Sequence, residues 1–168
     1  MQRREVYELE LSIKINRELP EGTFKFKQVF SGFEQVETVR KIFGDNTEKV
    51  LDNLYVIIEE SRGYLYVDDT LGAIVVNKDY LKKGKDEYLY LDVIHELVHI
   101  KQFMDGKELF DTNYSYVDRP TEIEAYRITV QEAKRIGLSE KQIADYLKVE
   151  WISEEDWKKL MKNSGLKS

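Results

Sequence analysis

The chain of 168 residues contains no cysteine, only two histidines and two prolines, and no long apolar run. The absence of cysteine excludes disulfide bonds, thiolate metal sites and a cysteine nucleophile. No stretch of about 18 apolar residues occurs, and the first residues, MQRREVYELELSIK, lack the apolar core of a signal peptide. We therefore expect a cytoplasmic protein without a membrane span.

The chain also lacks an excess of positive charge. Its net charge of −6 argues against a non-specific nucleic-acid binder, which requires a basic surface. Charged residues make up 35% of the chain and hydrophobic residues 42%, proportions typical of one globular domain. Neither a nucleic acid nor a membrane is an expected partner.

The two halves of the chain have different periodicities. Strand patterns dominate residues 1–85, at 7–15, 23–30, 54–58, 63–67 and 72–77, with a helical pattern at 33–43. Residues 86–138 predict two long helices joined by a loop, and residues 139–168 predict two short helices. We predict an α+β fold in a single domain, with a small mixed or antiparallel sheet packed on the two long helices.

Both histidines lie in one pentapeptide, HELVH, at residues 95–99. Two histidines four residues apart lie one above the other on a helix, so both imidazoles can bind one metal ion. Glu96 follows the first histidine and is placed to act on a water molecule bound to that metal. The pentapeptide therefore predicts a catalytic metal site formed by His95, Glu96 and His99.

The predicted helix at 86–104 is apolar around most of its circumference. Its polar residues share one arc of roughly 120°, at about 100° per residue. They are Asp92, His95, Glu96, His99 and Gln102. Because such a helix is buried on most sides, the polar stripe has to be satisfied inside the protein. The alternatives to a metal site are a buried hydrogen-bond network and a solvated stripe on a surface helix, and the broad apolar remainder disfavours the latter.

A metal held by two histidines requires a third protein ligand, and here that ligand has to be a carboxylate. The segment DRPTEIEAY, at 118–126, opens the second long helix with Pro120 in its first turn and offers Glu122 and Glu124. These glutamates lie about 200° apart, so only one can face the first helix. We predict Glu122, which lies beside the apolar stripe, whereas Glu124 continues into a charged face. The alternative is that both glutamates lie on an exposed helix start.

HELVH, followed 23 positions after His99 by Glu122 in an E-x-x-A segment, resembles the gluzincin group of zinc metallopeptidases. Compact members of that group, the minigluzincin-like proteins, combine a small sheet, a motif helix and a glutamate helix. The resemblance covers about residues 50–136 and implies one zinc ion per chain, bound by His95, His99 and Glu122, with Glu96 as the general base. No third histidine follows at the metzincin spacing, which disfavours that sister group.

One position departs from the family pattern. Several gluzincins carry an aspartate four residues after the liganding glutamate, where it supports a histidine ligand, but this chain has Tyr126 there. Asp92 is a candidate to replace that support. Tyr126 and Gln102 are further candidates for contacts around the metal ligands.

The predicted reaction is hydrolysis of a peptide bond by a zinc-activated water, with Glu96 accepting its proton. Tyr114 and Tyr116, in the loop between the long helices, are candidates for stabilising the oxyanion, although loop aromatics also serve simple packing. The run GAIVVN, from Gly72 to Asn77, is either a sheet edge to which a substrate peptide adds as a strand or an ordinary buried strand.

The C-terminal helices begin at Ser139, in a capping-box pattern, and at Ser153. The acidic start of the last helix, EED, disfavours a helix-turn-helix that binds DNA. With Trp151 and Trp157, these helices are expected either to close the core or to cover the cleft. A covered cleft would make the peptidase latent.

Other functions remain open from the sequence. One is a zinc hydrolase with a substrate other than a peptide, and another is a catalytically silent metal-binding sensor or interaction domain. A ferritin-like di-iron protein shares the Glu-x-x-His unit of Glu96 and His99, but it requires two such units on four long helices.

Overall fold

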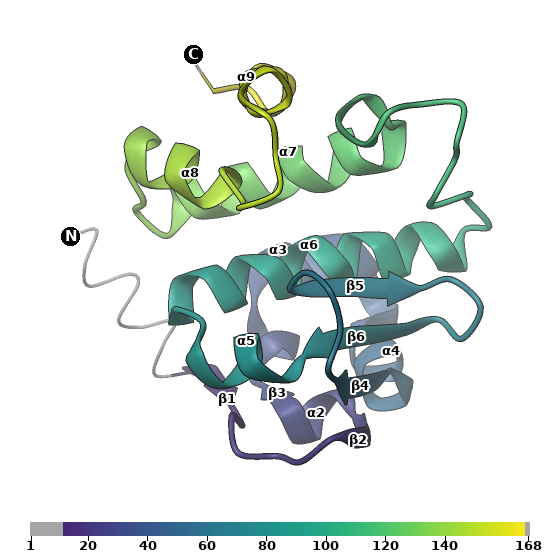
Figure 1. The fold of residues 1–168 in the computed structure, drawn as a ribbon. Helices are drawn as coiled ribbons and strands as arrows, with labels where there is room; N and C mark the ends of the chain where they lie inside the picture. The colour runs from purple at the N-terminus through teal and green to yellow at the C-terminus, as the bar shows by residue number, and fades with distance from the viewer. Residues whose placement is uncertain (1–11, 167–168) are drawn as a thin grey trace.

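The computed structural model describes residues 12–166 and has an α+β fold, as the sequence predicts. The elements form layers, in which the main sheet lies on one side of α6 (Asp86–Met104) and α7 (Pro120–Arg135) lies on the other (Figure 1). Helices α8 (Glu140–Leu147) and α9 (Glu154–Asn163) pack beyond α7. The remaining elements are β1 (Lys14–Ile15), β2 (Gly22–Lys25), α2 (Phe26–Val29), β3 (Phe30–Ser31), η1 (Phe33–Gln35), α3 (Glu37–Phe43), η2 (Gly44–Asn46), α4 (Thr47–Asn53), β4 (Tyr55–Glu59), β5 (Leu65–Asp68), β6 (Ala73–Asn77), α5 (Lys78–Lys83) and η3 (Tyr116–Asp118).

The main sheet is mixed and has the strand order β2-β4-β6-β5. β4 and β6 are parallel, with α6 packed across the sheet, and the other two pairings are antiparallel. A separate two-stranded ladder joins β1 to β3. β5 therefore forms one edge of the main sheet, and it contacts α6 along that edge (Figure 1).

The interpretation of the run from Gly72 to Asn77 as a sheet edge is wrong. β6 pairs with β4 on one side and with β5 on the other, so it has no free edge. Its first four residues are all buried. This is the pattern of a strand covered on both faces, and the alternative of an ordinary buried strand holds.

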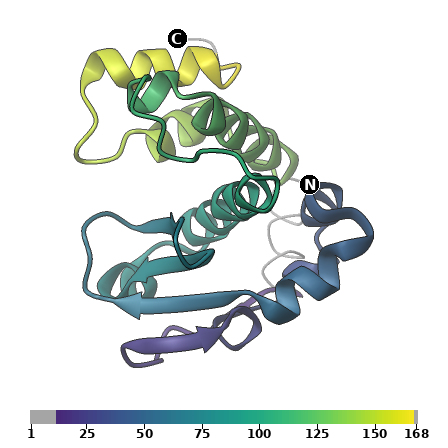
Figure 2. The ribbon, with the colours of Figure 1, turned by 90° about the vertical axis from the view of Figure 1, so that its right-hand side faces the viewer.

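Helix α6 has the bounds that the sequence predicts, residues 86–104. It ends in a Schellman-type turn, in which the N–H of Lys107 donates to the carbonyl of Gln102 and Gly106 has a φ of 79°. Most of its side chains are buried, between the sheet, α3 and α7. Figure 2 shows α6 in this central position. The polar stripe of the helix therefore lies inside the protein, as predicted.

The first half of the chain differs from the prediction in detail. The expected strand at 7–15 lies mostly outside the described residues, and its described end contributes β1. The segment 23–30 is divided between β2, α2 and β3, and α3 is preceded by the short helix η1. Two helices, α4 and α5, were not expected. Each has at most seven residues, which is too short for a clear helical period.

The two C-terminal helices form where predicted. Ser139 accepts a hydrogen bond from the N–H of Gln142 in a capping box, and Ser153 accepts one from the N–H of Asp156. Buried residues of both helices belong to the hydrophobic core, among them Ile143, Leu147, Leu160 and Met161. The helices therefore close the core. No helix in the described part of the chain combines the length and the apolar character needed to cross a membrane.

Candidate metal centre

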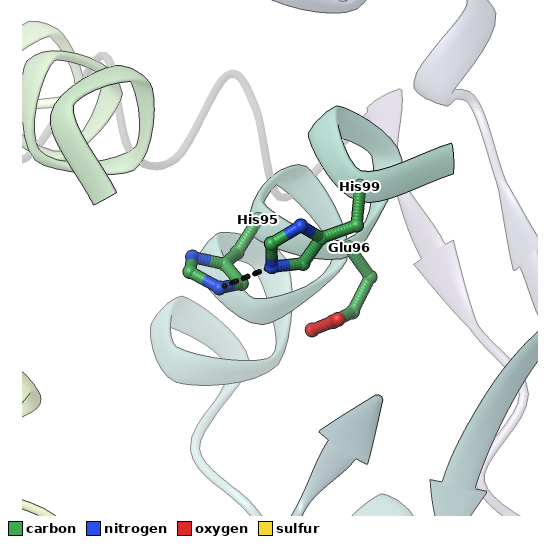
Figure 3. Close-up of side chains that lie close together, drawn as sticks. All are labelled: His95, Glu96 and His99. Carbon is green, nitrogen blue, oxygen red and sulfur yellow. Dashed lines mark hydrogen bonds between the residues drawn. The ribbon is translucent and has the colours of Figure 1, made fainter. Parts of the chain in front are cut away.

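The side chains of His95, Glu96 and His99 project from the middle of α6 and lie close together (Figure 3). Their potential ligand atoms all lie within 4.8 Å of one another, and all three residues are buried. The Nε2 atoms of the two imidazoles are 3.2 Å apart. This buried His-Glu-His group can hold a metal ion.

Helix α7 brings Glu122 to the same point. One carboxylate oxygen, Oε1, lies 3.0 Å from His95 Nε2 and 2.9 Å from His99 Nε2. Glu122 is 5% exposed and lies in the first turn of α7, where the helix dipole favours a negative charge. The prediction that Glu122, and not Glu124, faces the histidines is confirmed.

Glu124 has a different role. Its Oε1 accepts a hydrogen bond of 2.8 Å from Nε2 of Gln102 and lies 4.0 Å from the ammonium of Lys107. Nε2 of Gln102 also donates to the carbonyl of Thr121, at 3.0 Å. These two acceptors define which end of the Gln102 side chain is the amide nitrogen.

Gln102 in turn determines the tautomer of His99. Because its nitrogen already donates to two acceptors, its oxygen faces Nδ1 of His99 at 2.7 Å and accepts the N–H there. In the neutral imidazole, Nε2 of His99 then carries the lone pair and is directed at His95 and Glu122, which is the arrangement of a metal ligand; in the imidazolium form it donates to Glu122. Gln102, which the sequence offered among several candidates, is therefore in contact with a predicted ligand.

His95 has a weaker partner that the sequence analysis missed. Thr129 donates its hydroxyl hydrogen to the carbonyl of Ala125, and its oxygen lies 3.5 Å from Nδ1 of His95. A hydroxyl that has used its hydrogen can only accept, so this contact favours a proton on Nδ1 of His95. Thr129 lies seven residues after Glu122, two turns further along the same face of α7. That spacing was the signal available in the sequence.

The prediction that Asp92 supports a histidine is wrong. Its two carboxylate oxygens accept hydrogen bonds from the hydroxyls of Tyr80 and Tyr146. Tyr126, by contrast, packs against a ligand, since its ring centroid lies 4.3 Å from that of His95. Its hydroxyl is 2.6 Å from that of Tyr116.

The electrostatics of the site favour a positive charge between the histidines. Burial alone would raise the pKa of Glu122, but hydrogen bonds from His95 and His99 outweigh it and hold that pKa well below its usual range. Burial likewise opposes charge on His99, yet the contacts with Glu122 raise its pKa to about 9. Burial dominates at His95 and lowers its pKa.

Glu96 lies beside this centre without an ion-pair partner among the described residues. Burial raises its pKa well above the usual range, and the neighbouring carboxylates of Glu122 and Asp92 add to the effect against the opposing charge of His99. A carboxylate with a strongly perturbed pKa beside a candidate metal site is a candidate for proton transfer.

A cavity of about 140 Å³ adjoins the site, and His95 and Glu96 form part of its wall. Tyr116 and Tyr126 also line it, so both are placed near the predicted reaction. Tyr114 is exposed and does not line the cavity, so the structure gives it no contact with the site. The loop after α8 closes the far side, with Trp151 packed on Tyr64 at 5.0 Å between ring centroids.

Comparisons of the chain with models of protein families, with curated proteins and with solved structures find no match. The interpretation of the site therefore depends on the geometry and chemistry of its residues.

Proposed function

We propose that the chain is a zinc-dependent peptidase of the gluzincin type. The observation that carries the proposal is the convergence of two imidazole nitrogens and one carboxylate oxygen, at separations of 2.9, 3.0 and 3.2 Å. When both imidazoles are neutral and protonated at Nδ1, the three converging atoms all present lone pairs. A bound cation would hold these three atoms together, and protons on the imidazoles would do so in its absence.

The spacing and the donor set fit zinc. Zinc binds nitrogen and oxygen ligands at about 2.0–2.2 Å in tetrahedral geometry, which places neighbouring ligand atoms roughly 3.3 Å apart. The separations at the site are close to that value. Two histidines, one carboxylate and no cysteine form a three-ligand set of the kind found in catalytic sites, in which one position stays open to water.

Zinc in this position would polarise a substrate carbonyl and make a water molecule a stronger nucleophile near neutral pH. Glu96 is then the residue that accepts the proton of that water and returns it to the leaving amine. Its burial, which raises its pKa, suits it to both steps. Tyr116 and Tyr126 bring two hydroxyls to the cavity next to His95 and are candidates for stabilising the oxyanion.

The peptide would bind along β5. This strand is the edge of the main sheet that contacts α6, whereas β6 is paired on both sides. An extended peptide can add to such an edge as a further strand, which would bring its backbone past the histidines.

The first test is metal content and the variant Glu96→Gln. We expect one zinc per chain, and a loss of peptide hydrolysis of at least about 100-fold in the variant with zinc still bound, the lower range for loss of a general base. Glu87→Gln makes the same change in the first turn of α6, away from the site, and should leave both unchanged. If Glu96→Gln retained activity, Glu96 would not be the general base.

The loop between α8 and α9 supports a latent state. It supplies part of the cavity wall, and Trp151, although 60% exposed, packs on Tyr64 just before the edge strand β5. Removal of both C-terminal helices would expose core residues, so a single substitution is the cleaner test.

For a latent peptidase, Trp151→Ala should raise hydrolysis of a protein substrate severalfold. Tyr55→Ala, which removes an exposed aromatic at the start of β4, should not. If neither the wild type nor Trp151→Ala cleaves a broad peptide library with zinc bound, the site is catalytically silent and the chain acts as a metal-binding sensor. The α+β fold already argues against the ferritin-like alternative, which needs a four-helix bundle.

A further inference from the structure

The cavity beside the metal centre has room for one side chain. Its volume is about 140 Å³, and an apolar cavity of about 150 Å³ admits one benzene molecule. His95 and Glu96 form part of the wall, so the group that fills the cavity lies next to the bond that the metal centre would attack. The natural occupant is therefore the side chain of a substrate residue next to the scissile bond.

The walls are mainly aromatic. Tyr64 stacks on Tyr80 at 4.1 Å between centroids, Tyr88 meets Tyr146 edge to face at 5.1 Å, and Trp151 closes the outer side. Aromatic faces attract cations through the ring quadrupole, and the methylene stem of a lysine or arginine packs well on such rings. Walls of this kind suit a long side chain with a positive end.

A carboxylate lies in the wall between these rings. Asp92 is half-buried, lines the cavity and accepts one hydrogen bond on each oxygen, from Tyr80 and from Tyr146 at 2.5 Å. A carboxylate offers about four acceptor positions, so roughly two remain for a ligand. Burial raises the pKa of Asp92 to about 7, as expected of a carboxylate without a cationic partner.

The charge of the lining is negative. Asp145 and Glu96 add two further carboxylates, and Lys148 is the single cation among the described residues that line the cavity. The ammonium of Lys148 lies 4.3 Å from the ring centroid of Trp157 and 3.3 Å from Glu154, and neither of these residues belongs to the lining. Among the described residues, Asp92 therefore has no cation paired with it.

We infer that this cavity binds the side chain of a lysine or arginine next to the scissile bond of the substrate. The inference rests on the proposed peptidase function for the position of the bond, and on the cavity itself for the charge. An apolar side chain would displace water from Asp92 without replacing its hydrogen bonds, and an acidic side chain would be repelled by Asp92 and Asp145.

Binding tests the charge without any need for catalysis. The probes are Nα-acetyl-lysine methylamide and Nα-acetyl-norleucine methylamide, which share a four-carbon stem and differ in the ammonium. We expect the zinc-loaded wild type to bind the lysine probe at least tenfold more tightly, as followed by tryptophan fluorescence from Trp151 in the wall. Equal affinities, or tighter binding of norleucine, would overturn the inference.

The variant Asp92→Asn assigns the preference to this carboxylate. We expect the ratio of lysine to norleucine affinities to fall at least fivefold. Asp79→Asn removes the same charge from an exposed position in α5 that does not line the cavity, and it should keep the wild-type ratio. If Asp92→Asn kept the preference for the lysine probe, the ammonium of that probe would bind at a position other than Asp92. The wild-type comparison decides the inference even if this variant does not fold.

Cleavage distinguishes the inference from the proposed function. Peptides that differ only in lysine, norleucine or glutamate at one position should be cut at least tenfold faster next to lysine. If lysine binds preferentially but no peptide is cut, the cation site stands and the peptidase proposal fails. If peptides are cut without a preference for lysine, the peptidase stands and the cation site is refuted.

Discussion

The contact between Gln102 and His99 allows a quantitative test of the metal centre. Gln102 is 1% exposed and accepts the Nδ1–H of His99 at 2.7 Å, while its nitrogen donates to Thr121 and Glu124. The substitution Gln102→Met keeps the size and removes all three hydrogen bonds. Nothing then determines which nitrogen of His99 carries the proton.

Loss of such an outer partner typically weakens metal binding by about 10–100-fold, or about 1.4–2.7 kcal/mol. We therefore expect the zinc Kd of Gln102→Met to rise by that factor. The zinc-free protein should also lose about 1–3 kcal/mol of stability, because the carbonyl of Thr121 and the Nδ1–H of His99 lose a buried partner. A competition titration with a chromophoric chelator measures the first effect, and urea unfolding in the presence of a chelator measures the second.

Lys101→Met is the matched control, because it introduces the same side chain at the adjacent position of α6. The ammonium of Lys101 pairs with Asp105 at 2.7 Å on the surface, and such pairs contribute only about 0–1 kcal/mol. Its zinc Kd should stay within twofold of the wild type. If Gln102→Met also stays within twofold, Gln102 does not orient a metal ligand.

Two further predictions concern stability. Burial raises the pKa of Asp92 to about 7, so the stability that this group contributes is present below about pH 4 and is lost as the pH rises to about 7. In the zinc-free protein, Asp92→Asn should therefore gain about 2 kcal/mol of stability relative to the wild type between pH 4.5 and 8. This is half of the free energy that corresponds to the full pKa shift, because water in the cavity screens the charge. Urea unfolding that shows no pH-dependent difference between the two proteins would contradict this prediction. Glu132 is 1% exposed and accepts hydrogen bonds from Thr38, Tyr90 and Arg135, which joins α3, α6 and α7. Glu132→Ala should cost about 2–4 kcal/mol, because Thr38 and Tyr90 lose their buried acceptor while the exposed Arg135 can be solvated, whereas the exposed Glu140→Ala should change the unfolding free energy by less than about 1 kcal/mol.

The metal centre was the most predictable part of the molecule, because its geometry is local. HELVH places two imidazoles on one face by helical geometry alone, and α6 ends where Gly106 indicates. The choice of Glu122 needed only the angular separation of two glutamates on one helix and the position of the apolar stripe of that helix. The partners of the ligands were harder, because Thr129 and Gln102 become partners only when α6 and α7 pack together.

The tyrosine-lined cavity could not be predicted, since its residues come from separate parts of the chain. Tyr64 precedes β5, Tyr80 lies in α5 and Tyr146 lies in α8. No periodicity connects these segments, and only the packed structure brings their hydroxyls to Asp92. For the same reason the sequence offers Asp92 only as a candidate partner of a histidine: its position on the polar stripe of α6 is as predicted, but its partners belong to other helices.

The order of the strands decides how a substrate would meet this centre. The residues of β6 are apolar in succession, which is typical of a strand covered on both faces, whereas exposed and buried residues alternate in β5 at Tyr66 and Val67. That contrast was present in the sequence and favours β5 as the edge. Because Trp151 packs on Tyr64 directly before β5, a peptide that adds to this edge has to pass the same loop that closes the cavity. Binding of the peptide backbone, entry of its side chain into the cavity and displacement of the loop would then be coupled, so Trp151→Ala should lower KM more for a peptide with norleucine than for one with lysine, which also loses the attraction of its ammonium to the indole ring.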